Sequence, residues 1–180
     1  MQQFLKIFFK DNGSKFGFML VSIILILTFI VPVLLATNYS DINLDNVLKQ
    51  PNSKDWFGTD QYGRDYFTRV LYGGRNSLIS SFIIISSAVL LGFLFGIISG
   101  FYGGIMDEVV MRICDLIMSF PPFILAMAIA FTLGPGLKNT VLALIILWWP
   151  SYARLVRGVV LSIKEKDIQR DTDRSLKNVR

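Results

Sequence analysis

Four stretches without a charged residue, each close to the length that crosses a lipid bilayer, occupy most of this 180-residue chain. They cover residues 16–40, 76–106, 116–137 and 139–153. A helix rises about 1.5 Å per residue, so roughly 20 apolar residues cross a hydrocarbon core of about 30 Å. The first three stretches reach this length, and the fourth does so if Arg154 and Arg157 extend to the lipid headgroups. The pattern predicts an all-α, polytopic membrane protein with four transmembrane helices.

Composition favours the bilayer over a soluble protein with one large helical core, because apolar residues make up 53 % of the chain and lie in long blocks. The single cysteine, Cys114, excludes an internal disulfide, and the lack of histidine excludes histidine-dependent catalysis. We expect no cofactor, no metal site and no nucleic-acid partner. The basic start also resembles a secretory signal, but no clear cleavage site follows it, and we interpret it as an uncleaved first helix.

The basic residues predict the orientation of the chain in the plasma membrane. Twelve of the 18 Lys and Arg residues fall on the side of the two termini and six on the other side, which places both termini in the cytoplasm. We therefore expect a cytoplasmic N-terminus at 1–15, a transmembrane helix at 16–36, an external segment with an amphipathic helix at 37–76, a core at 77–161 with transmembrane helices at about 77–100, 112–133 and 139–159, and a charged cytoplasmic tail at 162–180.

Glycines and prolines mark two features of the predicted core. Gly92, Gly96 and Gly100 recur at steps of four, a small-residue face that lets another helix approach closely; glycine is also simply common in membrane helices, and this alternative stays open. Pro121 and Pro122 lie near the start of the third span. They indicate either a kink in a helix that lines a pathway or plain helix initiation.

Acidic residues near the third span allow a second class of function. Asp107 and Asp115 lie on one face of a predicted helix, and two carboxylates in a membrane could act as acid and base of an intramembrane enzyme. Arg112 lies between them, and Glu108 precedes it by four residues, the spacing of a helical ion pair. A solvated loop helix explains these residues equally well.

Five sequence blocks occur in an order that resembles the second type of permease subunit in dipeptide, oligopeptide and nickel ABC importers. The resemblance covers roughly residues 56–167. The blocks are GTDQYGRDYFTRVLYGGRNSL (58–78), GFLFGIISGFYGG (92–104), MRICDLIMSFPP (111–122), LGPGLKN (133–139) and WPSYARLVRG (149–158).

The resemblance implies a six-helix permease subunit, itself not an enzyme, that moves peptides across the membrane with energy from its partners. Those partners are a sister permease, two cytoplasmic ATPases and an external solute-binding protein. Two groups of residues match positions of interest. Gly58, Asp60, Gly63, Arg64 and Asp65 lie in the external block, where they brace an outer gate, contact the binding protein or simply build a turn; Arg154, Arg157 and Glu165 mark the cytoplasmic exit and the approach to the coupling region.

The chain departs from the family pattern after residue 167. The Glu-Ala-Ala-x-x-x-Gly motif of the coupling loop and the last two spans are not found in the sequence. A truncation or frameshift, a fragment of a longer chain, and a split subunit completed by another chain each explain this departure. Three functions follow: a subunit of a peptide importer, a subunit of a nickel importer, or a truncated remnant that pairs with the sister permease through its glycine face and transports nothing.

Overall fold

The computed structural model describes residues 11–35 and 41–178, and these residues are largely helical. The elements are α2 (Asn12–Leu25), the π-helical turn η1 (Ile26–Ile30), α3 (Val31–Leu35), the 3-10 turn η2 (Leu44–Asn46), α4 (Tyr66–Tyr102), α5 (Gly104–Met118), α6 (Pro122–Leu133) and α7 (Leu137–Asn178). Within the described ranges, extended pairing is limited to one isolated bridge between Thr59 and Asp65. The predicted all-α fold is confirmed.

The chain divides into two compact units, residues 1–79 and 80–180, which are described separately. Parts of the predicted segments lie outside the described residues: 1–10 of the N-terminal segment, 36 at the end of the first span, 37–40 of the external segment, and 179–180 of the tail.

The described part of the first unit starts with a helical segment formed by α2, η1 and α3. Asp11 caps its start, because its carboxylate accepts hydrogen bonds from the backbone N–H (2.9 Å) and the hydroxyl (3.1 Å) of Ser14. These bonds lower the pKa of Asp11. Pro32 has no N–H to donate to the carbonyl of Thr28, and the widened π-helical turn, which contains Thr28, ends two residues before the proline. Residues Asn12–Leu34 are long and apolar enough to cross a membrane.

α4 is a single helix of 37 residues, about 55 Å long at its regular rise. Because the hydrocarbon core is only about 30 Å thick, part of α4 extends beyond it. The structure does not separate the amphipathic helix predicted before residue 77 from the span predicted after it; both belong to α4. The first helical segment closely approaches this part of α4, since a Cβ on Gly74 would lie 2.9 Å from Cγ2 of Thr28.

The second unit contains a sharp bend where the third span is predicted. α5 and α6 meet at 93° across the short break between them, so the range 112–133 falls on two helices. The ring of Pro122 keeps the preceding residue out of the helical conformation, and Pro121 has an extended ψ of 125°. A second joint lies at the start of α5, where Gly103 and Gly104 adopt φ of 66° and 55°.

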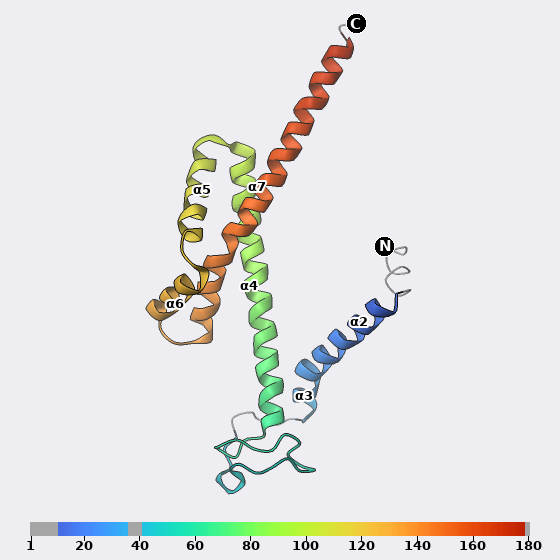
Figure 1. Ribbon diagram of the computed structural model, residues 1–180, viewed down its shortest axis with the longest axis vertical. Coiled ribbons are helices and arrows are strands. Elements are labelled where there is room, and N and C mark those ends of the chain that lie inside the picture. Colours follow the sequence, from blue (N-terminus) through green and yellow to red (C-terminus); the bar gives the residue numbers. More distant parts are fainter. Residues whose placement is uncertain (1–10, 36–40, 179–180) are drawn as a thin grey trace. The chain divides into compact units, whose positions relative to one another are not determined.

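α4 and α7 run parallel within the second unit (Figure 1). Gly92 of α4 faces Tyr152 of α7, and Gly100, two turns later, faces Val160. Residue numbers therefore increase in the same direction along both helices. The chain therefore leaves the end of α4 and returns to the beginning of α7 through α5 and α6. Because this return reverses the direction of α4, we interpret the bent pair as one crossing of the membrane.

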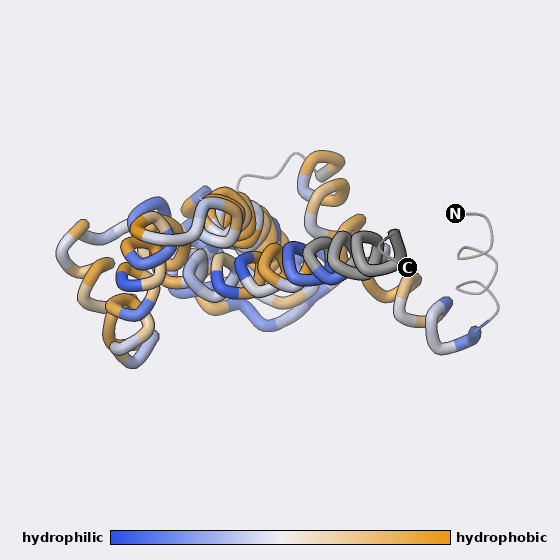
Figure 2. The backbone as a smooth tube through the Cα atoms, turned by 90° about the horizontal axis from the view of Figure 1, so that it is seen from above, coloured by the Kyte–Doolittle hydropathy of each residue, from blue (hydrophilic) through white to orange (hydrophobic). Residues whose placement is uncertain are grey.

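The surface of the helices fits lipid rather than water. Three helical stretches are long and apolar enough to cross a membrane, and the bent pair raises the number to four. Large apolar side chains are widely exposed, among them Phe82 (74 %), Phe123 (83 %) and Phe131 (90 %), and the helices carry long hydrophobic stretches in Figure 2. A water-soluble monomer rarely exposes such patches. The protein is thus a multi-pass membrane protein, and the alternative of a large soluble core is wrong.

Candidate functional site

The external block forms a compact turn over residues 58–65, which we call the external turn. It is hydrogen bonded to residues 43–50 through the backbone: the N–H of Thr59 donates to the carbonyl of Lys49 (3.1 Å), and the N–H of Leu48 donates to the carbonyl of Asp60 (3.2 Å). The hydroxyl of Thr59 donates to the carbonyl of Asn46 and accepts from the N–H of Lys49 at 2.9 Å. Two segments of the region predicted to be external are thereby joined without a regular sheet.

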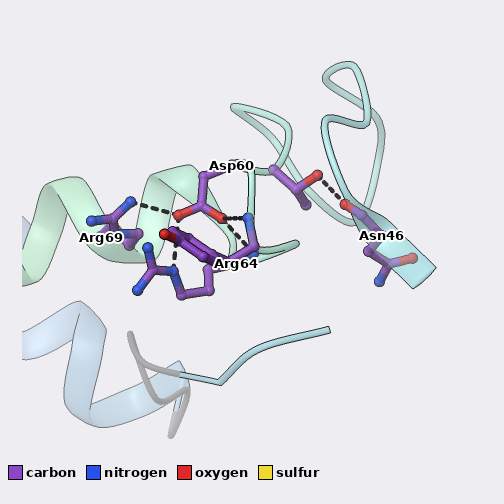
Figure 3. Close-up of polar contacts among 6 residues, drawn as sticks. Asn46, Asp60, Arg64 and Arg69 are labelled. Carbon is purple, nitrogen blue, oxygen red and sulfur yellow. Dashed lines mark hydrogen bonds and ion pairs between the residues drawn. The ribbon is translucent and has the colours of Figure 1, made fainter. Parts of the chain in front are cut away.

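Asp60 is the centre of the external turn and is almost fully buried. Its carboxylate accepts hydrogen bonds from the backbone N–H groups of Tyr62 (2.8 Å) and Arg64 (3.0 Å). It also pairs with Nε of Arg64 at 2.9 Å and Nη1 of Arg69 at 2.6 Å, as Figure 3 shows. Burial raises the pKa of Asp60, but these hydrogen bonds and charges outweigh that effect and lower the pKa to about 2.

Three further residues of the predicted external motif shape the same turn. Gly58 and Gly63 adopt φ of 71° and 70°, the left-handed region that glycine enters at little cost. A Cβ on Gly63 would lie 2.7 Å from the carbonyl carbon of Asn43. Asp65 caps α4, since its carboxylate accepts from the N–H (2.8 Å) and the hydroxyl (2.6 Å) of Thr68.

In the second unit, the three glycines of α4 lie against α7. A Cβ on Gly92 would lie 2.9 Å from the carbonyl oxygen of Trp149, and one on Gly96 would lie 2.7 Å from that of Ala153. At Gly100 the corresponding atom is Cβ of Val160, at 2.9 Å. Real side chains do not approach to such distances, so any residue larger than glycine would separate the two backbones. We call this contact the glycine seam.

Two ion pairs connect α5 to α7. Asp107 binds Arg157 in a bidentate manner, with Nε and Nη2 each 2.5 Å from a carboxylate oxygen, and the buried hydroxyl of Ser99 on α4 donates to the same carboxylate. Farther along α5, Asp115 pairs with Arg154. Between the two pairs, α5 and α7 meet through apolar side chains: Val110, Cys114 and Ala153, with Met111 and Trp149 packed against them.

Two mainly apolar cavities border Trp148 of α7. One, of about 110 Å³, lies at the bend between α5 and α6 and is lined by Ile117, Met118, Phe120, Pro122, Leu147, Trp148 and Ser151. The other, of about 240 Å³, lies between α4 and α7 and is lined by Ile84, Ile85, Ala88, Trp148 and Tyr152. The indole of Trp148 thus belongs to the walls of both cavities.

The structure groups the predicted residues in two places. It brings the external motif together around Asp60, and it places Gly100 beside the backbone of Arg157. Glu165 is exposed farther along α7. Sequence reasoning missed Arg69, Ser99 and Lys164, whose ammonium donates to the carbonyl of Phe101 at 3.0 Å near the end of α4. Only Arg69 carries a sequence signal, because it lies one helical turn after the Asp65 cap.

The same geometry bears on the two acidic residues considered for catalysis. Asp107 and Asp115 are eight residues apart on one helix, about 12 Å along its axis, and each binds a different arginine. They therefore do not share a proton as a carboxylate dyad would. Among the described residues, no group of three or more potential metal ligands comes together.

Comparison with known proteins places this arrangement in a known class. Residues 92–170, which contain the glycine seam and both ion pairs, match the family model of the binding-protein-dependent transport system inner membrane component. The chain is 37 % identical to the dipeptide transport system permease protein DppC of Alkalihalophilus pseudofirmus over 88 % of its own length and 52 % of that protein. It is 38 % identical to the oligopeptide transport system permease protein OppC of Bacillus subtilis, over 88 % of its length and 52 % of that protein.

A third relative, the probable D,D-dipeptide transport system permease protein DdpC of Escherichia coli, is 38 % identical over 87 % of this chain and 56 % of its own length. The chain thus spans about half the length of the curated relatives that it matches. These matches and the multi-pass helical fold define the class of the chain as an inner membrane component of a binding-protein-dependent transport system. The chain belongs to the family of binding-protein-dependent (ABC) transport inner membrane components, and the relatives that it matches are named for the transport of peptides.

Proposed function

We propose that this chain is a transmembrane subunit of an ABC importer for peptides. The observation that carries the proposal is its similarity, over nearly nine tenths of its length, to three permeases named for dipeptide or oligopeptide transport. A fourth relative is named for glutathione, itself a small peptide, and is 39 % identical over 72 % of the chain. These names favour peptide over nickel as cargo.

The proposed partners are a sister permease, two cytoplasmic ATPases and an external solute-binding protein, and ATP hydrolysis belongs to the ATPases. The chain lies in the plasma membrane with both termini in the cytoplasm. This orientation is supported by the distribution of the basic residues. It is also supported by the parallel direction of α4 and α7, because two parallel spans need one return crossing between them, which makes four crossings with the first helix. In this orientation, Arg154 and Arg157 lie near the middle of α7, where the chain leaves the membrane on the cytoplasmic side.

Each part of the described core has a place in this function. The glycine seam holds α4 and α7 together, and the bent pair α5 and α6 borders the smaller of the two cavities beside Trp148. We assign the transport pathway to the surfaces of α4 to α7 that border these cavities. The external turn is rigid enough to brace the outer opening or to receive a binding protein, because its central carboxylate is saturated with donors.

Co-purification tests the assembly. The chain is expressed with its sister permease and the two ATPases, and the subunits that accompany it in mild detergent are identified. Recovery of both ATPases and uptake of a labelled dipeptide would support the proposal. Recovery of the sister permease alone, without uptake, would instead indicate the non-transporting remnant. Uptake of nickel but not of peptide would contradict the assigned cargo.

A further inference from the structure

α5 is a rigid segment between two joints. It has 15 residues, about 22 Å as a helix. At its start Gly103 and Gly104 both have positive φ, and a Cβ on either would meet no atom within 4 Å. At its end, the three-residue break before Pro122 turns the chain by 93°. Backbone rotation at these two places changes the position of α5 without altering its own hydrogen bonds.

The two ion pairs that hold α5 to α7 are unequal. The side chains of Asp107 and Arg157 are 22 % and 32 % exposed, and their bidentate contact is reinforced by the hydroxyl of Ser99. Those of Asp115 and Arg154 are 54 % and 42 % exposed and share a single contact. Asp107 thus accepts three hydrogen bonds, two of them in a bidentate contact with one arginine, whereas Asp115 accepts one from Arg154, and bidentate charge-assisted contacts are the stronger kind. The Asp115 end of α5 is therefore the end that separates first.

The apolar contact between the two ion pairs must open when the Asp115 end moves. Cys114 and Ala153 are fully buried there and Val110 nearly so. The contact involves few side chains, all of small or medium size except Met111 and Trp149. Cys114 is directly beside Asp115 in the sequence and is the single cysteine of the chain. Its thiol therefore reports on any separation of α5 from α7.

We propose that α5 pivots on the Asp107–Arg157 pair and swings away from α7 at its other end, with the Asp115–Arg154 pair acting as the latch. At the helical rise, Val110 lies about 4.5 Å from the pivot along the axis and Cys114 about 10 Å, so the displacement at Cys114 is roughly twice that at Val110. The relevance of this movement to transport rests on the proposed function; the movement itself does not, and it is measured without partners.

Alkylation of Cys114 tests the latch. The full chain is placed in lipid vesicles, and the rate at which N-ethylmaleimide modifies Cys114 is followed by mass spectrometry. We expect Asp115→Asn and Arg154→Gln each to raise the rate about fivefold or more, because either change opens the latch. Glu108→Gln is the matched control: its pair with Arg112 spans 3.9 Å, is largely exposed and stays within α5, so the rate should not change.

A second reporter tests the pivot. Val110→Cys is combined with Cys114→Ser, and the same latch variants are introduced. A pivot at Asp107 predicts a clearly smaller increase at residue 110 than at residue 114. Equal increases at both positions would mean that α5 detaches as a whole and would overturn the pivot.

A charge exchange tests whether faster alkylation of Cys114 in the single variants results from misfolding. The double variant Asp115→Arg with Arg154→Asp rebuilds the pair with reversed charges and should return the alkylation rate of Cys114 to within about twofold of the original. An unchanged rate in Asp115→Asn, no alkylation in any variant although the thiol reacts after denaturation in detergent, or no recovery in the double variant would each overturn the latch. If the alkylation rates change as expected but the unmodified chain supports no peptide uptake with its partners, only the proposed function is contradicted.

Discussion

Asp60 carries its charge under nearly all conditions, because the donors around it lower its pKa from the usual 3.8 to about 2. A group whose pKa is lower in the folded state stabilises that state above its unfolded pKa and loses the effect as the pH falls. The external turn should therefore keep its full stability above about pH 4 and loosen as the pH approaches 2.

Hydrogen exchange of the amides in residues 43–65 measures this effect. In Asp60→Asn the exchange should be faster than in the unmodified chain at pH 7. Between pH 4 and pH 2 the unmodified chain should lose protection, whereas the variant should show no such further loss, because it has no carboxylate to titrate at this position. Asp41→Asn, at an exposed position of the same region, serves as the control and should behave like the unmodified chain. Identical exchange in all three proteins would contradict the central role of Asp60.

Gly63 is a second position in the external turn that accepts no residue type other than glycine. Gly63→Ala would force a side chain into the left-handed region, at about 1–2 kcal/mol, and would bring Cβ within 2.7 Å of the carbonyl carbon of Asn43. We expect limited proteolysis within residues 43–65 to become several times faster. Gly73→Ala is the matched control, because that glycine is helical and has no atom within 4 Å of the added Cβ; it should leave the turn intact.

At the scale of helices, the glycine seam determines how closely α4 and α7 pack. Gly96→Leu would place Cβ 2.7 Å from the carbonyl oxygen of Ala153 and 2.8 Å from Cβ of Val156, and overpacking of this kind costs about 1–3 kcal/mol. We expect a lower melting temperature in detergent and loss of peptide uptake. Gly158→Leu, on α7 where nothing lies within 4 Å of the added Cβ, should melt normally. Unchanged uptake and assembly in Gly96→Leu would remove the packing role.

The bend between α5 and α6 depends on both prolines. Each keeps the residue before it from the helical conformation, so changing one alone leaves the other to interrupt the helix. In the double variant Pro121→Ala with Pro122→Ala, the two helices can join into one.

Spin labels at Val109 and Phe131, both exposed, with Cys114→Ser in the background, report this change by pulsed electron paramagnetic resonance. Two arms meeting near a right angle predict a backbone separation of about 23 Å, whereas one continuous helix predicts about 33 Å. A distance that does not lengthen in the double variant would show that packing against α7, rather than the prolines, maintains the bend.

For the whole molecule, the number of crossings determines where the two ends of the chain lie. Four crossings, with α5 and α6 counted as one, would place both termini on the same side, and the basic residues predict that this side is the cytoplasm. Peptide tags at the two ends should therefore both resist protease in sealed right-side-out vesicles and both be cleaved after the vesicles are broken. Cleavage of one tag only would mean that the bent pair does not cross.

Much of the architecture could be predicted from the sequence because the bilayer imposes strong local rules. Uncharged runs of sufficient length indicate membrane helices, and Gly92, Gly96 and Gly100 mark one helix face by their spacing alone. Local conformation was less accessible. The sharp bend at Pro121 involves two consecutive proline rings. The helix α4 continues through residue 77 although the stretch before it contains two adjacent glycines, which are poor helix formers.

By itself, the sequence determined that this protein is helical, lies in a membrane and resembles a transport permease, since hydropathy, charge and motif order are properties of short segments. Only the tertiary structure decided that the glycine face meets α7, that Asp107 binds Arg157 fifty residues away, and that Asp115 binds Arg154. Such pairings depend on the register and direction of helices that meet in space. Many combinations of acids and arginines are compatible with one sequence, and the close approach of α4 to α7 selects among them.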